Sequence, residues 1–171
     1  MHLETERLLI RDWRVEDAEA AFTVYGNPEV MRFVGTGQPY ESLEQTRLSL
    51  RRIVARDSDK PLGFWAVQDR SSGELVGGAL LKYLPDHSDV EVGYHLGKRW
   101  WGQGIATEIA CALVRYGFEQ LGLERIVAVT YPENLASQRV LEKAGLIHMG
   151  LGMYVDIEVE TFLLERWAWN G

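Results

Sequence analysis

The stretch "KRWWGQGIATE", residues 98–108, places two tryptophans and two glycines within five positions. An apolar set with helical spacing begins at Ile105, so the glycines stand at the start of a predicted helix. Glycine is a poor helix former that leaves the backbone bare, whereas tryptophan is bulky. Because the first N–H groups of a helix have no partner inside it, a bare backbone there can bind an anion. The stretch therefore predicts a phosphate-binding loop between a strand and a helix.

The residues around this loop predict an α+β fold. Alternation over 89–96 predicts a strand directly before the loop, and helical spacing over 105–121 predicts a helix directly after it. Further strands are expected at 7–11, 63–69, 74–84, 125–131, 147–153 and 158–168, and further helices at 15–27, 42–57 and 134–145. No repeat, linker or low-complexity tract interrupts the chain. We therefore expect one domain over residues 1–171 with a central mixed sheet.

The composition is that of an ordinary globular domain of 171 residues, with 46% hydrophobic and 25% charged residues. The formal net charge is −7, which argues against broad binding to nucleic acid or to an anionic lipid surface. A cationic or amine-bearing ligand is better matched to this charge. We therefore expect neither a nucleic-acid partner nor a membrane partner.

The start of the chain carries charges at Glu4, Glu6 and Arg7, before any apolar run can form. This pattern is not that of a signal peptide, and no apolar stretch reaches the roughly 18 residues of a membrane span. We therefore expect a cytoplasmic location.

Cysteine and histidine usage gives no sign of a metal site. Cys111 is the single cysteine, which excludes an internal disulfide and a cysteine-based cluster. The four histidines, His2, His87, His95 and His148, are scattered without ligand spacing. No metal is therefore expected.

Three kinds of phosphate loop compete for the two glycines. A P-loop needs Gly-Lys-Ser/Thr after the glycines, and Gly104-Ile105-Ala106 does not match. A dinucleotide fingerprint needs a third glycine or alanine where Thr107 stands, and its acidic residue should follow a strand, whereas Glu124 precedes one. The third pattern, Arg99-x-x-Gly102-x-Gly104, fits together with the strand before it and the helix after it.

This third pattern resembles the pyrophosphate loop of the GCN5-related N-acetyltransferases (GNAT family), which reads Gln/Arg-x-x-Gly-x-Gly/Ala. A second match lies in "NLASQRVLEKAGL", residues 134–146, where Asn134, Ser137, Lys143 and Gly145 fit the family's second cofactor segment. Leu146 departs from it, because phenylalanine is usual there. The segment is similar to that of the ribosomal-protein N-acetyltransferase branch, as is "LETERLLIR" at residues 3–11. The resemblance covers nearly the whole chain in the right order.

The resemblance implies a fold and an activity. The expected fold is a twisted, mixed but mainly antiparallel sheet of about seven strands flanked by about four helices, with two strands splayed apart at the cofactor site. The expected activity is that of an acyltransferase. Acetyl-CoA donates its acetyl group directly to a primary amine, either a protein N-terminal α-amine or a small-molecule amine, without a covalent enzyme intermediate or a metal.

The resemblance also implies which residues hold the cofactor. The pyrophosphate is expected on the loop: Arg99, Gly102, Gln103, Gly104, Ile105 and Ala106. Backbone groups of His95, Leu96 and Gly97 are expected to pair with the pantetheine arm. Asn134, Ser137 and Arg139 are expected to line the second cofactor segment. Roles without cofactor contact remain open for three of these residues: Arg99 and Arg139 are also typical surface charges, and Asn134 is a good helix N-cap.

Two side chains are candidates for proton transfer. Glu91 lies mid-strand, where an unpaired carboxylate is costly, so it is either the base that deprotonates the amine through a water or a paired structural carboxylate. Ser137 is implied as a hydrogen-bond donor or proton source for the thiolate, but an early-helix serine also caps free N–H groups. His95 shares the Glu91 face by alternation and either relays a proton or simply forms hydrogen bonds.

Two other functions remain in competition with the enzyme. A non-catalytic acyl-CoA-binding module would keep the loop and lose turnover, and a nucleotide-binding oxidoreductase fragment is disfavoured by the missing third glycine. The acceptor is expected between the segment 31–40 and the C-terminal strands, where no motif is readable. The sequence leaves the oligomeric state open, and a homodimer is one alternative, because edge strands in this fold often pair.

Overall fold

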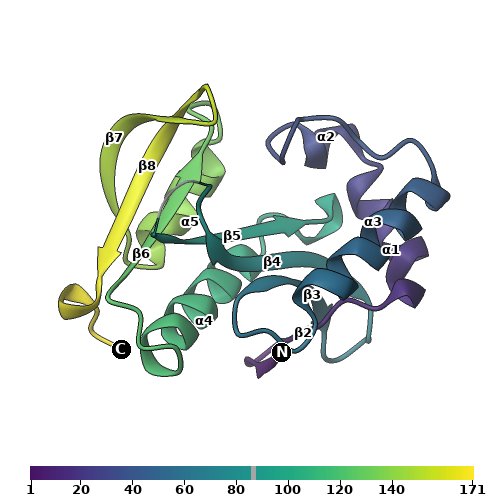
Figure 1. The fold of residues 1–171 in the computed structure, drawn as a ribbon, viewed down its shortest axis with the longest axis horizontal. Coiled ribbons are helices and arrows are strands. Elements are labelled where there is room, and N and C mark those ends of the chain that lie inside the picture. Colours follow the sequence, from purple (N-terminus) through teal and green to yellow (C-terminus); the bar gives the residue numbers. More distant parts are fainter. Residues whose placement is uncertain (86–87) are drawn as a thin grey trace. The chain divides into compact units, whose positions relative to one another are not determined.

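The computed structural model describes residues 1–85 and 88–171, so His87 lies outside the described residues. Its strands are β1 His2–Glu4, β2 Leu8–Arg11, β3 Gly63–Asp69, β4 Leu75–Tyr83, β5 Val90–Leu96, β6 Arg125–Thr130, β7 Ile147–Tyr154 and β8 Ile157–Glu165. Its α-helices are α1 Ala18–Tyr25, α2 Pro28–Met31, α3 Leu43–Asp57, α4 Ile105–Glu119 and α5 Leu135–Lys143 (Figure 1). These elements follow the predicted order along the chain.

The strands form one sheet in the order β1-β2-β3-β4-β5-β6-β8-β7. Strands β5 and β6 run parallel and pair at Val90↔Ile126 and Glu91↔Val127. Strand β2 is antiparallel to β1 and β3, and β8 is antiparallel to β6 and β7. This confirms the mixed, mainly antiparallel sheet and the α+β class.

The described residues contain eight strands and five α-helices, where about seven and about four were predicted. The additional strand is β1, whose three residues are too few to show alternation. The additional helix is α2, which starts anew after Gly26 has ended α1. Asn27 caps it by accepting the Glu29 N–H at 2.9 Å, and Pro28 fits the first helical position.

The chain forms two compact units, each described by itself below. The first unit contains residues 1–80 and 94–106, and the second contains residues 81–93 and 107–171. Within the described residues, no helix is both long enough and apolar enough to span a membrane. A single domain over residues 1–171 stays a prediction.

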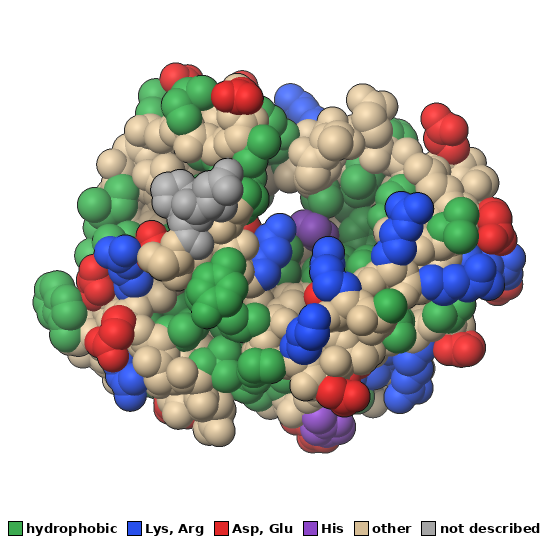
Figure 2. Space-filling model, viewed as in Figure 1, with side chains coloured by type: hydrophobic (Ala, Val, Ile, Leu, Met, Phe, Trp, Pro, Cys, Tyr) green, Lys and Arg blue, Asp and Glu red, His purple; other side chains and the backbone are tan. Residues whose placement is uncertain are grey.

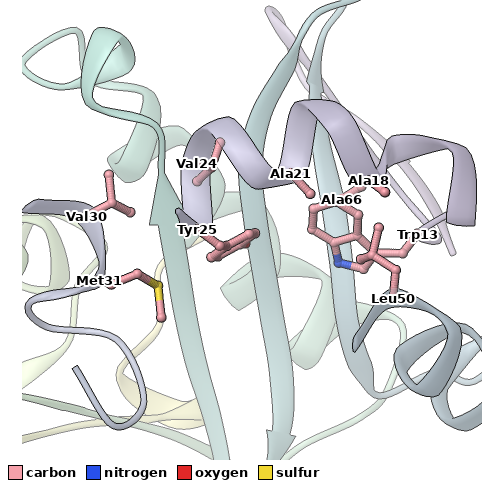
Figure 3. Packing of buried hydrophobic residues seen from close by; sticks show 9 residues of the cluster. All are labelled: Trp13, Ala18, Ala21, Val24, Tyr25, Val30, Met31, Leu50 and Ala66. Carbon is pink, nitrogen blue, oxygen red and sulfur yellow. The ribbon is translucent and has the colours of Figure 1, made fainter. Parts of the chain in front are cut away.

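The core of the first unit is built around α1, which lies beside α3 (Figure 1). Figure 3 shows Trp13, Ala21, Tyr25 and Leu50 among the buried side chains that fill it. Helix α3 begins as predicted, because the Ser42 hydroxyl accepts the Gln45 N–H at 3.2 Å. These contacts anchor the helices beside strands β3 and β4 of the same unit.

The core of the second unit lies between α4 and strands β6 and β8. Ile109, Leu113 and Phe118 are fully buried on α4. Gly117 lets the helix approach closely, since a Cβ there would lie 2.7 Å from Cδ1 of Ile126. Strand β7 lies at the edge of the sheet, and β7 with the turn residue after it carries an exposed apolar row along the chain: Ile147, Met149, Leu151, Met153 and Val155. A β-bulge between His148 and Gly150 interrupts its alternation, so the row is not confined to one face.

Charged side chains of both signs are interspersed on the surface. Figure 2 shows lysine and arginine side chains among acidic ones on the face that it presents. The net charge of −7 is therefore spread over the chain and is not gathered in a single block on this face.

Candidate active site

The loop of the first unit has the backbone that its glycines predict. A short 3-10 helix, Lys98–Trp100, follows β5, and α4 begins at Ile105. Between them Gly102 and Gly104 adopt φ values of +73° and +77°, in the left-handed region that favours glycine. A Cβ at Gly102 would meet nothing within 4 Å. The glycines are therefore needed for the path of the backbone and for an open surface above it.

The backbone N–H groups of this loop are available to a ligand. Within the part of the chain that the structure describes, the N–H groups of residues 102–105 donate to no protein acceptor. They stand at the positive end of a helix of 15 residues. Successive unpartnered N–H groups at a helix start form an anion-binding concavity. The loop therefore fits a pyrophosphate.

Arg99, predicted at the loop entry, is held by an ion pair. Its Nη1 donates to Oε1 of Glu74 at 3.1 Å, and its Nη2 donates to Oε2 of the same carboxylate. The guanidinium also lies over the Trp100 ring, 4.7 Å from its centroid. Both Arg99 and Glu74 are largely exposed, so water screens their attraction and the pair can exchange for a phosphate.

Arg7 is a second cation at the loop, and sequence reasoning missed it. Its Nη1 donates to the carbonyl oxygen of Gln103 at 3.0 Å. Its Nη2 lies 3.7 Å from the position that a Cβ on Gly104 would occupy. The contact joins residues 96 positions apart, so no local pattern reveals it.

The backbone groups predicted to meet the pantetheine differ in their availability. The Gly97 N–H donates to Val76 O at 2.9 Å, and the Gly97 carbonyl accepts the Trp100 N–H at 2.9 Å. Since the Gly97 N–H faces β4, the backbone groups of Leu96 face the opposite side of β5. The Leu96 carbonyl accepts the Trp101 indole N–H at 2.9 Å.

The backbone of His95 lies close to β4, because a Cβ on Gly77 would come within 1.9 Å of the His95 carbonyl oxygen. Its ring contacts the rings of Tyr25 and Phe64, with centroid distances of 5.9 and 5.5 Å. The His95 side chain is therefore part of an aromatic cluster of the first unit.

Glu91 is a buried carboxylate of the second unit, with 9% of the residue exposed. The Nζ of Lys82 lies 4.0 Å from its Oε2. Burial raises the pKa of Glu91, and the positive charge of Lys82 partly opposes this rise. Burial also raises the pKa of Tyr154, and the negative charge of Glu91 adds to that effect. Sequence reasoning found Glu91 but neither Lys82 nor Tyr154, which carry no motif.

The second cofactor segment has the predicted helix and cap. The Asn134 Oδ1 accepts the Ser137 N–H at 3.2 Å, so the structure brings these two residues together at the start of α5. Gly145 follows the end of α5 with φ +93°. Ser137 is half-buried, and Arg139 is exposed. Asn134 is therefore an N-cap, whatever else it contacts.

Among the residues in the two described ranges, no group of three or more His, Cys, Asp or Glu side chains is arranged to hold a metal ion. The candidate polar groups of the first unit are the loop N–H groups and Arg99, and those of the second unit, taken by itself, are Glu91, Asn134, Ser137 and Arg139.

Unpartnered N–H groups at the start of a helix that follows a central strand are typical of the phosphate sites of nucleotide-cofactor enzymes. The model of the acetyltransferase (GNAT) domain family matches residues 7–147. The chain belongs to this family and is an acetyltransferase.

Comparisons with individual proteins agree with this family. An uncharacterized N-acetyltransferase of Bacillus subtilis, YoaA, is 37% identical over 150 residues, covering 87% of this chain and 84% of YoaA. The structure of a GNAT-family acetyltransferase from Bacillus anthracis superimposes with a TM-score of 0.82 at 26% identity, covering 98% and 99% of the two chains. RimL, a ribosomal L7/L12 alpha-N-protein acetyltransferase solved with coenzyme A, has a TM-score of 0.80 over 96% of this chain and 98% of its own. Its identity of 17% makes that a likeness of fold.

Proposed function

We propose that this acetyltransferase uses acetyl-CoA and transfers the acetyl group to a primary amine by direct attack. The observation that carries the proposal is the row of loop N–H groups at residues 102–105, which find no protein acceptor in the described residues and stand at the start of α4. Coenzyme A carries a pyrophosphate that suits this row. The name of YoaA adds that a relative of substantial identity acts on nitrogen.

Cofactor contacts are proposed for the first unit and, independently, for the second. The loop at residues 102–106 holds the pyrophosphate, with Arg99 exchanging Glu74 for phosphate. Of the backbone positions predicted on β5, we propose Leu96 as the one that pairs with pantetheine, because both groups of Gly97 are bonded to the backbone, whereas the Leu96 carbonyl is bonded only to the exchangeable Trp101 side chain. Asn134, Ser137 and Arg139 remain the proposed contacts of the second segment.

Glu91 is proposed as the general base. A lysine amine has a pKa near 10.4 and an α-amine near 7.7–8.0, so a protonated amine must lose a proton before it attacks. A carboxylate whose pKa is raised by burial is a stronger base than an ordinary one. The amine nitrogen then forms a bond to the thioester carbonyl carbon, the C–S bond breaks, and the electron pair leaves on sulfur. Glu91 takes the proton of the ammonium through a water before the attack. The second proton, which the nitrogen loses as the amide forms, goes to the thiolate, to which Ser137 donates a hydrogen bond.

The competing proposal of a non-catalytic acyl-CoA-binding module would gain support if Glu91 were sealed away from any cleft and no other base lined the acceptor side. The Glu91 side chain keeps 12% of its exposure, so water can reach it. This supports the enzyme. The acceptor is proposed to be a protein N-terminal α-amine or a small-molecule amine, in the cytoplasm, and the acidic net charge favours a cationic acceptor.

A second copy of the chain is proposed as a partner at β7. Residues 147–155 contain no Asp, Glu, Lys or Arg, and the edge strand exposes the apolar row defined above. Edge strands normally carry charges that prevent pairing, so an uncharged edge fits antiparallel pairing with itself across a two-fold axis. Light scattering on wild type and on Leu151→Glu tests this. A monomeric wild type would refute it.

The experiment that tests the function is an acetyl-CoA assay against a panel of amines: N-terminal peptides, lysine peptides, polyamines and amino acids. Release of free CoA thiol is followed with a chromogenic disulfide, and the product is identified by its mass. Glu91→Gln serves as the low-activity control. Acetylation of one amine class supports the proposal, and CoA binding without turnover on any amine would favour the binding module.

A further inference from the structure

Arg7 lies in the turn between β1 and β2, yet its side chain ends at the candidate pyrophosphate loop of the same unit. Its Nη1 donates to the Gln103 carbonyl oxygen at 3.0 Å, and its Nη2 lies beside Gly104. Its own carbonyl accepts the Arg70 N–H at 2.9 Å, which fixes the backbone from which the side chain extends. The contact therefore links the first strands of the chain to the loop.

The bonded carbonyl determines where the next N–H group points. The Gln103 C=O and the Gly104 N–H belong to one peptide group, which is planar and trans, so the two point in opposite directions. Because Arg7 holds the carbonyl on one side of the loop, the Gly104 N–H is turned to the other side. That side is where the unpartnered N–H groups of residues 102–105 would meet an anion.

The charge of Arg7 strengthens the same arrangement. A cation on the carbonyl oxygen polarises the peptide group and makes its N–H a better donor. Within the first unit Arg99 is paired with Glu74, and Lys98 is paired with Glu29 at 2.7 Å.

We propose that Arg7 is a positioning residue for the cofactor: through the Gln103 carbonyl it orients and polarises the loop N–H groups that bind the pyrophosphate of acetyl-CoA. The inference rests on the proposed function and adds to it a residue outside the loop pattern. Arg7 acts through the loop, so it affects donors that carry phosphates and leaves donors without phosphates unaffected.

The test compares two acetyl donors, acetyl-CoA and S-acetyl-pantetheine, which lacks the pyrophosphate. The variants are Arg7→Gln, Arg7→Lys and the matched control Arg51→Gln, which removes the same charge from an exposed position on α3. For Arg7→Gln we expect the KM for acetyl-CoA and the Kd for CoA to rise about tenfold, as is usual for a lost hydrogen bond to a charged group. The kcat at saturation and the KM for S-acetyl-pantetheine should stay within about twofold, Arg7→Lys should recover part of the affinity, and Arg51→Gln should match wild type.

Three outcomes would overturn the inference. If Arg7→Gln raises the KM of both donors equally, or lowers kcat along with the melting temperature, Arg7 only stabilises the fold. If it binds CoA as tightly as wild type does, Arg7 plays no part in cofactor binding, while the proposed function stands. If wild type itself fails to bind CoA by calorimetry, the proposed function and this inference fall together.

Discussion

The Nζ of Lys82 lies 4.0 Å from Oε2 of Glu91, and this pair controls the charge of the candidate base. Burial favours the neutral acid and raises the pKa of Glu91, whereas Lys82 favours the carboxylate and lowers it. The net effect is a raised pKa. Lys82 is half exposed, so solvent and salt weaken its part.

The first prediction concerns stability. A carboxyl group with a raised pKa in the folded state binds more protons there than in the unfolded state, so it lowers stability as pH rises through that range. Glu91→Gln should therefore raise the melting temperature at pH 7.5 by a few degrees, about 2–4 °C for each kcal/mol gained. The difference should vanish below the ordinary pKa of glutamate, near pH 4. Thermal scans at both pH values check this, and a lower melting temperature at pH 7.5 would contradict it.

The second prediction concerns the rate. Loss of a general base costs about 10²–10⁴-fold, so Glu91→Gln should lower kcat within that range and leave the KM for acetyl-CoA nearly unchanged. In wild type, kcat should rise with pH as Glu91 loses its proton, which gives the pH profile of kcat an acid limb. In Glu91→Gln this acid limb should be absent. A wild-type rate across the whole pH range in Glu91→Gln would show that Glu91 is structural.

The third prediction separates Lys82 from Glu91. Lys82→Gln removes the charge that lowers the pKa of Glu91, so the acid limb of kcat should move to higher pH. The shift should shrink in 0.5 M salt, because exposed charges are screened. If the acid limb of kcat in Lys82→Gln lies at the same pH as in wild type in low salt, a group other than Glu91 titrates there.

The fourth prediction concerns the loop glycines. Gly104→Val places a β-branched residue at φ +77°, which strains the loop, crowds Arg7 and so changes the direction of the loop N–H groups. CoA binding by calorimetry should be lost while the far-UV circular dichroism stays native. Gly35→Val is the control, since Gly35 also has positive φ (+56°) and open space around it. Gly35→Val should keep its CoA affinity, and retained affinity in Gly104→Val would refute the loop assignment.

The fifth prediction uses Trp101 as a reporter. Its indole N–H is bonded to the Leu96 carbonyl, the group that we propose for pantetheine. CoA binding should displace or share this bond and change the tryptophan fluorescence. Trp101→Phe should lose most of that signal and bind CoA at least as tightly, because it leaves the carbonyl unoccupied. Replacing Trp167, which is 85% exposed, gives the control.

The parts of the site that the sequence predicted are those in which neighbouring residues determine the geometry. Gly102 and Gly104 needed positive φ at a helix start, and Asn134 stood where a cap was due, so local chemistry identified them. Glu91 could be placed because a mid-strand carboxylate is unusual in any sheet. The order of the elements along the chain followed from local patterns, and the family followed from the two cofactor segments.

The parts that the sequence did not predict depend on tertiary contacts. Arg7 reaches Gln103 across 96 residues, and Glu74 reaches Arg99 across 25, so neither pair lies within one local pattern. Lys82 and Tyr154 come near Glu91 only through the tertiary structure, and Lys82 lies on β4 next to β5, so its position depends on the register of these two strands. The pairing of the Gly97 N–H with Val76 likewise depends on that register, which decides which backbone groups of β5 remain open.

Glycines required by packing and glycines of the candidate phosphate loop should be retained to different degrees in descendants of this protein. A Cβ on Gly77 would lie 1.9 Å from the His95 carbonyl oxygen, and a Cβ on the next residue, Gly78, would lie 2.5 Å from the Phe64 ring and from the Tyr25 hydroxyl. Both glycines are therefore required by the fold alone. Gly102 and Gly104 have room for a side chain but adopt positive φ, and we propose that the ligand also keeps them as glycine. A lineage that lost acetyl transfer should therefore keep the first pair and let the second drift towards asparagine or aspartate, which tolerate positive φ. The amino-acid sequence alone would then distinguish an active homologue from one that has lost acetyl transfer.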